Sequence, residues 1–263
     1  MINSMQMALI KKDIRSITEN KRLFSVLLIV PLIMTVVLPS VFVLLAGLLP
    51  IDSPDFQELL AVLPKEMVQG DLRESLIRVI FNNIISVFFL LIPIMASSVV
   101  AGSSFVGEKE KRTLETLLYC PLSLRQIFSA KIIASFALSQ LVSFVSFAAM
   151  FLVIQTEIWF ITGGLILPGP GWLILMLLVS PALSLVGISL IVRGSAKAKT
   201  VEESQQRSVF LILPIILLAV GQFSGLLMVS GWILLGVGIL CAAVGLILLR
   251  RSSASFHYER LLQ

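Results

Sequence analysis

The chain has 263 residues, of which 57% are hydrophobic and only 13% are charged, with a net charge of +5. A soluble domain carries about 25% charged residues, so this composition excludes an ordinary soluble protein. The apolar residues form runs long enough for membrane-spanning helices, and the basic residues lie in short clusters beside these runs. That pattern is typical of membrane topology and argues against a nucleic-acid partner.

The chain begins with a polar, basic segment, residues 1–22, that we expect to form an amphipathic helix. Ile10, Ile14 and Ile17 share one helical face, while Lys11 and Lys12 lie elsewhere. Such a helix is typical of the cytoplasmic membrane interface, in contact with membrane lipids. A solvated leader is the alternative interpretation.

The apolar runs that follow predict an all-α integral membrane protein with six transmembrane helices. These crossings fall at about 23–49, 79–106, 131–155, 172–192, 208–229 and 232–249. Six crossings leave no room for a separate soluble domain, so we expect one membrane domain over residues 1–263. Small residues crowd the second half of the second crossing, which favours close contact between helix backbones.

The distribution of charge predicts the orientation. All of the 20 basic residues except Lys65, Arg73 and Arg78 lie in four segments, 1–22, 107–131, 193–207 and 250–263. Six crossings place these four segments on one side of the membrane, and the positive-inside rule makes that side cytoplasmic. We therefore expect both termini in the cytoplasm and an acidic extracytoplasmic segment at residues 51–78, in which Asp71 and Glu74 resemble a capping box.

The crossings offer little chemistry. No Asp, Glu, Lys or Arg lies well inside a predicted crossing, which argues against an ion-coupled carrier or a channel with charged rings. Amide side chains within the crossings are candidates to line a translocation pathway, although interhelical hydrogen bonding is the more common role of such groups. These candidates are Asn82, Asn83, Gln140 and Gln222.

The sequence predicts no catalytic residues, no metal site and no cofactor for this chain. His257 is the only histidine and lies in the tail, and the two cysteines, Cys120 and Cys241, are expected to be unpaired thiols. A base near a nucleophile is needed for covalent catalysis, and none is indicated. The chain also has no phosphate-binding loop of the form G-x-x-x-x-G-K-[ST], so any ATP must be bound by another subunit.

The most informative segment is the first cytoplasmic loop, residues 107–130, which we expect to form a helix, a break and a second helix. Leucines at 114, 117 and 118 make one apolar face of the first helix. Pro121 ends this helix, and Ser123 with Gln126 forms a capping box that starts a helix continuing into the third crossing. The apolar face is suited either to a groove on a partner or to the inner leaflet.

This loop resembles the signature loop of ABC-2-type transport permeases, the membrane subunits of ATP-binding-cassette exporters. The matching residues are Glu108, Glu110, Thr113-Leu114-Glu115, Leu117-Leu118, Pro121-Leu122-Ser123 and Lys131. Many members have Gly before the Thr, where this chain has Arg112. The 195–207 loop, with Lys199-Thr200 and Glu202-Glu203, is similar to the second cytoplasmic loop of the family.

The resemblance implies a function. In the family the first cytoplasmic loop docks on an ABC ATPase subunit, which binds the ATP, and permeases work in pairs of identical or related copies. It therefore implies an exporter permease in the cytoplasmic membrane of a prokaryote, with no activity of its own. A membrane scaffold or sensor that recruits a cytoplasmic partner is the alternative. The implied coupling residues are Glu108, Glu110, Arg112, Thr113, Glu115, Leu117 and Leu118.

Overall fold

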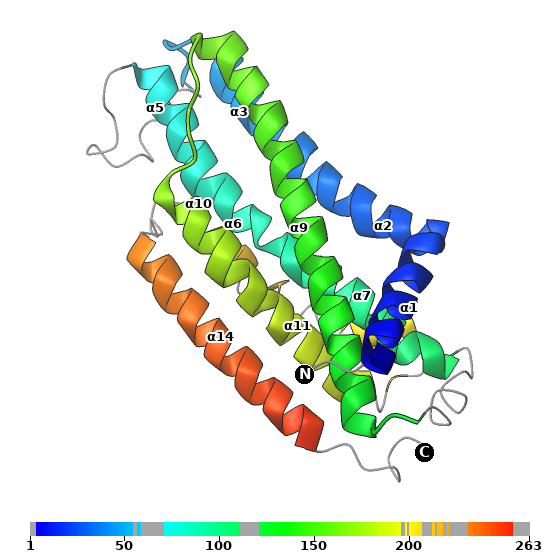
Figure 1. Ribbon diagram of the computed structural model, residues 1–263. Coiled ribbons are helices and arrows are strands. Elements are labelled where there is room, and N and C mark those ends of the chain that lie inside the picture. The colour runs from blue at the N-terminus through cyan, green and yellow to red at the C-terminus, as the bar shows by residue number, and fades with distance from the viewer. Residues whose placement is uncertain are drawn as a thin grey trace.

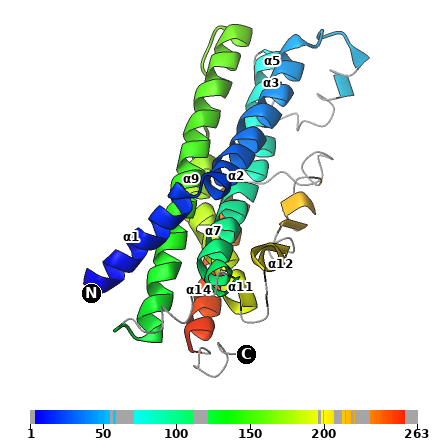
Figure 2. The same ribbon diagram turned by 90° about the vertical axis from the view of Figure 1, so that its right-hand side faces the viewer.

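The computed structural model describes residues 4–54, 57–58, 71–110, 121–195, 198, 200–206, 212–213, 215–217, 220 and 231–254. Every regular element within these residues is a helix. The long helices run side by side to form one bundle, and a shorter helix, α1 (Ser4–Glu19), lies against one end of it (Figures 1 and 2). The all-helical class predicted from the sequence is confirmed for the described part of the chain.

Five helical stretches among the described residues are long and apolar enough to cross a membrane. They are Lys21–Leu48, Leu72–Glu110, Leu124–Thr162, Pro170–Ser195 and Trp232–Leu249. These stretches correspond to five of the six predicted crossings. The remaining one, at about 208–229, falls mostly outside the described residues, so the count of six stays a prediction.

The centre of the bundle is the helix that ends the second crossing, α7 (Leu91–Glu110). It packs against α9 (Leu124–Thr162) and α11 (Ser180–Ser195), and α11 packs in turn against α14 (Gly231–Ala254). The second crossing, which contains α7, is 72% buried over its most apolar stretch. The crossing within α14 is only 17% buried over the corresponding stretch. The bundle therefore leaves wide apolar faces on its outermost helices, which suit lipid or another subunit.

Small residues set the close contact between α7 and α11, as the sequence predicts. A Cβ placed on Gly187 of α11 would lie 2.5 Å from Ser97 Oγ of α7. A larger side chain therefore fits there only if the Ser97 hydroxyl or one of the two helices shifts. In the absence of a hydrophobic driving force between helices in lipid, such close packing is a main source of their association.

Three of the crossings contain π-helical turns, and two of these turns precede a proline. The first crossing consists of α2 (Lys21–Leu32), the π-turn η1 (Ile33–Val37) and α3 (Leu38–Leu48). The fourth consists of α10 (Pro170–Ile174), the π-turn η4 (Leu175–Val179) and α11. In each, the π-turn ends two residues before a proline, Pro39 or Pro181. Proline removes a backbone donor and crowds the preceding turn, and a π-turn is one way to accommodate it.

The second crossing begins earlier than its apolar run suggests. It consists of α5 (Leu72–Val79), the π-turn η3 (Ile80–Ile84), α6 (Ile85–Phe89) and α7. Asp71 caps α5 by accepting a hydrogen bond from the backbone N–H of Arg73 at 2.9 Å. The cap predicted for this position is present, although its backbone donor is Arg73 and not Glu74.

By contrast, α9 is one α-helix of 39 residues without a π-turn. It begins at the predicted capping box, in which Ser123 accepts from the backbone N–H of Gln126 while the Gln126 side chain accepts from the N–H of Ser123. It ends at Gly163, whose φ of 71° is the left-handed conformation that favours glycine at a helix C-terminus. The helix extends beyond the predicted crossing, about 131–155, at both ends. The prediction was shorter because it followed the apolar run and not the helix ends.

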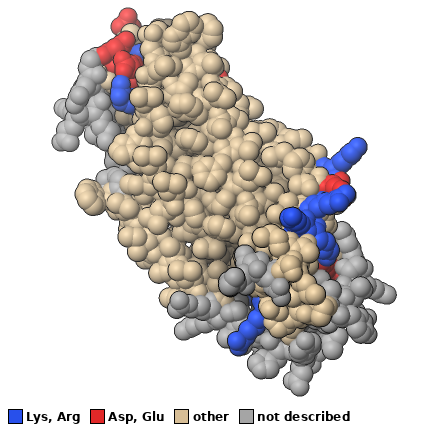
Figure 3. All heavy atoms as spheres, viewed as in Figure 1, with Lys and Arg blue, Asp and Glu red and all other residues tan. Residues whose placement is uncertain are grey.

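On the face shown in Figure 3, charged side chains gather toward the two ends of the bundle, and the belt between them consists of uncharged residues. We call the end that holds α1, the end of α7 and the start of α9 the basic end, since Lys12, Arg15 and Arg125 lie there. The C-terminal end of α14 lies at the same end (Figure 1). The opposite end carries Asp71 and Glu74 at the start of α5.

Candidate functional site

The predicted coupling residues divide between described and undescribed parts of the chain. Glu108 and Glu110 form the last turn of α7, directly before the segment 111–120. The rest of the predicted coupling set lies outside the described residues, as does Gln222, so their roles stay predictions. These coupling residues are Arg112, Thr113, Glu115, Leu117 and Leu118.

A buried group of charged side chains lies where the segment 111–120 leaves α7 and where α9 begins. The side chain of Lys131 on α9 is only 3% exposed. Its Nζ donates to the backbone carbonyl of Ser104 at 2.7 Å and to Asp13 Oδ2 of α1 at 3.3 Å, and it lies 2.9 Å from Glu108 Oε2. A fully buried ammonium needs such a complete set of acceptors, because it has lost its water.

Two further contacts complete this group. Ser104 Oγ donates to Asp13 Oδ2 at 2.8 Å, and Lys12 Nζ donates to Glu108 Oε1 at 2.7 Å. Lys12, Asp13, Ser104, Glu108 and Lys131 are hereafter the ionic cluster. The three buried charges of Asp13, Glu108 and Lys131 sum to −1, and the half-exposed ammonium of Lys12 brings the cluster to neutrality.

The sequence carries a signal for this cluster, a charged residue on the apolar face of α1, that was not among the predicted site residues. Asp13 lies four residues after Leu9 and four before Ile17, both buried, so a carboxylate occupies the apolar face of α1. Ser104 and Glu108 are likewise four residues apart on α7, and therefore face the same way. A charged residue at a buried position of an amphipathic helix indicates a buried partner, although the partner itself is not identifiable from one sequence.

The apolar face predicted for the N-terminal helix is present, and it packs against protein. Leu9 and Ile10 contact Ile127, Ala130 and Ala134 of α9 in a small cluster separate from the main core. The helix in 1–22 is therefore observed as α1, with its apolar face directed at the base of α9. Its location in the membrane interface stays a prediction.

The described part of the second predicted cytoplasmic loop lies beside the end of α7. Its short helix α12 (Val201–Gln206) packs against α7, and the backbone N–H of Val201 donates to Glu110 Oε2 at 3.2 Å. A Cβ on Gly102 of α7 would lie 3.1 Å from Ser204 Oγ, so the two helices are in close contact. Glu110 therefore joins the start of α12 to the last residue of α7 before the segment 111–120.

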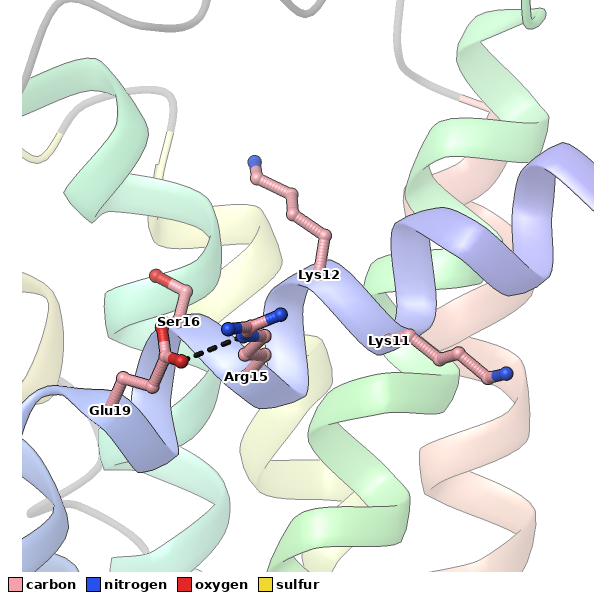
Figure 4. A pocket seen from close by; sticks show the side chains of 5 residues that line it. All are labelled: Lys11, Lys12, Arg15, Ser16 and Glu19. Atoms are coloured by element: carbon pink, nitrogen blue, oxygen red, sulfur yellow. Dashed lines mark hydrogen bonds and ion pairs between the residues drawn. The ribbon is translucent and has the colours of Figure 1, made fainter.

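The outer face of α1 carries a shallow pocket of about 510 Å³ (Figure 4). It is lined by Lys11, Lys12, Arg15, Ser16 and Glu19. Arg15 Nε donates to Glu19 Oε1 at 2.7 Å, and this hydrogen bond together with the carboxylate charge raises the pKa of the guanidinium. All five side chains come from one helix, and the described residues contain no group of three or more His, Cys, Asp and Glu suited to a metal ion.

The described amides within the crossings all make hydrogen bonds within the chain. Gln140 of α9 is buried, and its Nε2 donates to Ser184 Oγ of α11 at 2.8 Å. Asn82 Oδ1 accepts from the backbone N–H of Gly169 at 2.7 Å, and Asn83 Nδ2 donates to the carbonyl of Val79 at 3.3 Å. The amides of Gln140 and Asn82 thus connect separate segments, while a pathway role for any of the three stays a prediction.

Comparison with known families decides what this architecture belongs to. The family model described as ABC-2 type transporter matches residues 6–221. The chain belongs to the ABC-2 type transporter family. The match begins within α1 and includes the ionic cluster, the segment 111–120 and α12. No curated protein and no solved structure matches the chain.

Membership establishes the general function. This ABC-2 chain is a multi-pass membrane protein and a transport permease component. Permeases of the family associate in general with ABC ATPase subunits and act as dimers. The resemblance read from the first cytoplasmic loop is thereby confirmed at the level of the family.

Proposed function

We propose that the protein is the permease subunit of an ABC exporter in the cytoplasmic membrane of a prokaryote. In this proposal two copies, or this chain and a related permease, pair in the membrane and bind two ATPase subunits at the basic end. ATP binding closes the ATPase subunits and shifts the segment 111–120. The paired membrane domains then expose a substrate site alternately to the two sides.

The arrangement at the basic end is the observation that carries this proposal. In the chain, the segment 111–120 follows α7 and precedes Ser123 at the start of α9. α9 and the second crossing, of which α7 is the last part, each extend through the whole bundle. Glu110 ties its start to α12, and Lys131 ties α9 back to Glu108 on α7. A push on this segment is therefore transmitted to long helices that extend to the far end of the bundle, as a coupling element requires.

The chain itself supplies no site for the nucleotide. The absence of a phosphate-binding loop in the full sequence supports a separate ATPase subunit. The charge balance at the basic end, where exposed Lys and Arg side chains are frequent, also supports a cytoplasmic location for the docking surface. In this proposal the chain contributes the membrane pathway and the docking helix, and hydrolysis takes place on the partner.

The pathway is proposed to lie between the two permeases. Gln140, Asn82 and Asn83 are engaged in hydrogen bonds inside one chain, which leaves little polar lining within a single copy. The first crossing and α14 instead present broad apolar faces on the outside of the bundle. A pathway between copies with mostly apolar walls suits a substrate that carries substantial apolar surface.

A purification experiment tests the proposal. The tagged chain is extracted from its native cells in mild detergent, and the proteins that accompany it are identified and assayed for ATP hydrolysis. We expect an ATPase with a Walker-type phosphate loop to accompany the wild-type chain, and Glu115→Lys to remove it. Glu19→Gln on the exposed face of α1 is the matched control and should retain the ATPase.

Two outcomes would contradict the proposal. Recovery of the chain alone, or only with proteins that do not hydrolyse ATP, would favour the scaffold or sensor. Retention of the ATPase by both Glu115→Lys and the double variant of Leu117 and Leu118 to Asp would show that the segment 111–120 is not the docking element.

A further inference from the structure

We propose that the ionic cluster clamps α1 to the bases of α7 and α9, so that the N-terminal helix moves with these two helix ends as one body during the ATP cycle. Asp13 and Lys131 are the positioning residues of this clamp. The inference rests on the proposed function for its role in transport, whereas the clamp itself is a property of this chain alone.

The geometry makes Lys131 the central member. Its ammonium is carried by α9 and contacts the two other helices, through Asp13 of α1 and through Ser104 and Glu108 of α7. The side chains of Lys131 and Asp13 are only 3% and 5% exposed. A displacement of the base of α7 relative to α9 must therefore alter the contacts of Lys131 Nζ. Asp13 contacts the same Nζ atom, so its position depends on the same displacement.

Apolar and ionic contacts both hold α1 against the bundle. Leu9 and Ile10 pack on the base of α9 with Ile14 partly buried beside them, and Ile17 packs into the main core. Apolar packing is non-directional, whereas ionic contacts among buried groups can fix register. The contacts of Asp13 therefore add a directional constraint on the position of α1 against α7 and α9.

Lys12 gives the clamp an exposed side. Its side chain is 55% exposed, yet its Nζ lies 2.7 Å from Glu108 Oε1. The buried carboxylate of Glu108 is therefore shared between one buried and one exposed ammonium. If Asp13 and Lys131 are both neutralised, Glu108 still keeps Lys12 as its partner, so the double substitution leaves no unpaired buried charge.

Hydrogen exchange on the purified full chain tests the clamp without any partner. We expect Asp13→Asn and Lys131→Met each to raise exchange of the α1 amides by about a hundredfold, because each removes the buried ion pair between α1 and α9 and leaves the cluster with an unbalanced charge. The double variant restores the charge balance and should exchange more slowly than the product of the two single effects predicts. Glu19→Gln is the control and should exchange as the wild type, because among the described residues the Glu19 carboxylate pairs with Arg15 of the same helix. Unchanged exchange in both single variants would overturn the clamp.

A second arm tests movement as one body. The chain is purified with its ATPase, and exchange is compared with and without a non-hydrolysable ATP analogue. In the wild type we expect α1, the end of α7 and the start of α9 to change protection together, and in Asp13→Asn we expect α1 not to follow. A nucleotide response in α7 and α9 with none in wild-type α1 would overturn the coupled movement. No response anywhere, with the clamp intact in the first arm, would instead count against the exporter and not against the clamp.

Discussion

Lys131 Nζ lies 3.3 Å from Asp13 Oδ2, although 118 positions separate the two residues in the chain. The contact is almost inaccessible to solvent and joins the N-terminal helix to the longest described helix. Because removal of one partner from a buried ion pair leaves the other charge without compensation, this pair is a sensitive point of the fold.

We expect Lys131→Met to lower the free energy of unfolding by about 3–5 kcal/mol, since Asp13 and Glu108 would then lose the buried ammonium group that they share. The measurement is the thermal unfolding midpoint of the purified chain in detergent. Arg125→Gln removes a neighbouring exposed cation of α9 and should shift the midpoint little. Equal shifts in the two variants would contradict the importance of the buried pair.

The helix contact between Gly187 and Ser97 gives a second prediction. Gly187→Ala should destabilise the bundle by about 1–3 kcal/mol, because the new Cβ would meet Ser97 Oγ at 2.5 Å. Adding Ser97→Ala should recover much of this loss, because the Oγ atom is removed and the next contact is at 3.6 Å. The same thermal measurement applies. Gly236→Ala, with open space at its Cβ, is the control.

The capping box at the start of α9 gives a third prediction. Ser123→Ala should cost about 0.5–2 kcal/mol locally and fray the first turn of α9, because the N–H of Gln126 loses its acceptor. Hydrogen exchange of residues 124–128 measures this directly. Ser129→Ala removes a hydroxyl that donates to the backbone carbonyl of Gln126 in the same helix, and it should leave exchange of that turn unchanged. Since the cap adjoins the segment 111–120, transport should also fall in Ser123→Ala.

Gln140 separates a structural role from a pathway role. Gln140→Leu should lower stability by about 0.6 kcal/mol, and by at most about 1.7 kcal/mol, which is the range for interhelical hydrogen bonds in membranes. The loss arises because Ser184 and Ser180 lose their partner on α9. If Gln140 lines the pathway instead, the variant will change the set of transported compounds without a change in the unfolding midpoint.

The sequence was sufficient for features that depend on neighbouring residues. The Ser123–Gln126 capping box was predicted because it involves residues within one helical turn. The five crossings that fall within the described residues were predicted at the right places but too short at several ends, since hydropathy marks the membrane core and not the helix end. The π-turns before Pro39 and Pro181 were not predicted, because proline alone does not specify how a helix adapts.

The candidate site was predicted less completely. Glu108 and Glu110 were selected through the loop pattern, and both make contacts to other segments. Asp13 was missed, because its significance depends on Lys131 and Ser104, which approach it only after three helices have packed together. One sequence contains no record of such distant pairings, and the folded structure shows this one.

The unbroken course of α9 has a mechanical consequence. At a rise of 1.5 Å per residue, its 39 residues make a rod of about 58 Å, roughly twice the thickness of the hydrocarbon layer. The crossings that contain π-turns can bend at those turns and take up a displacement locally. A continuous α-helix transmits a displacement mainly by tilting. A tilt of about 5° would carry the far end of such a rod through about 5 Å. α9 is thus built as a lever whose short movement at the capped end becomes a wide swing at Gly163.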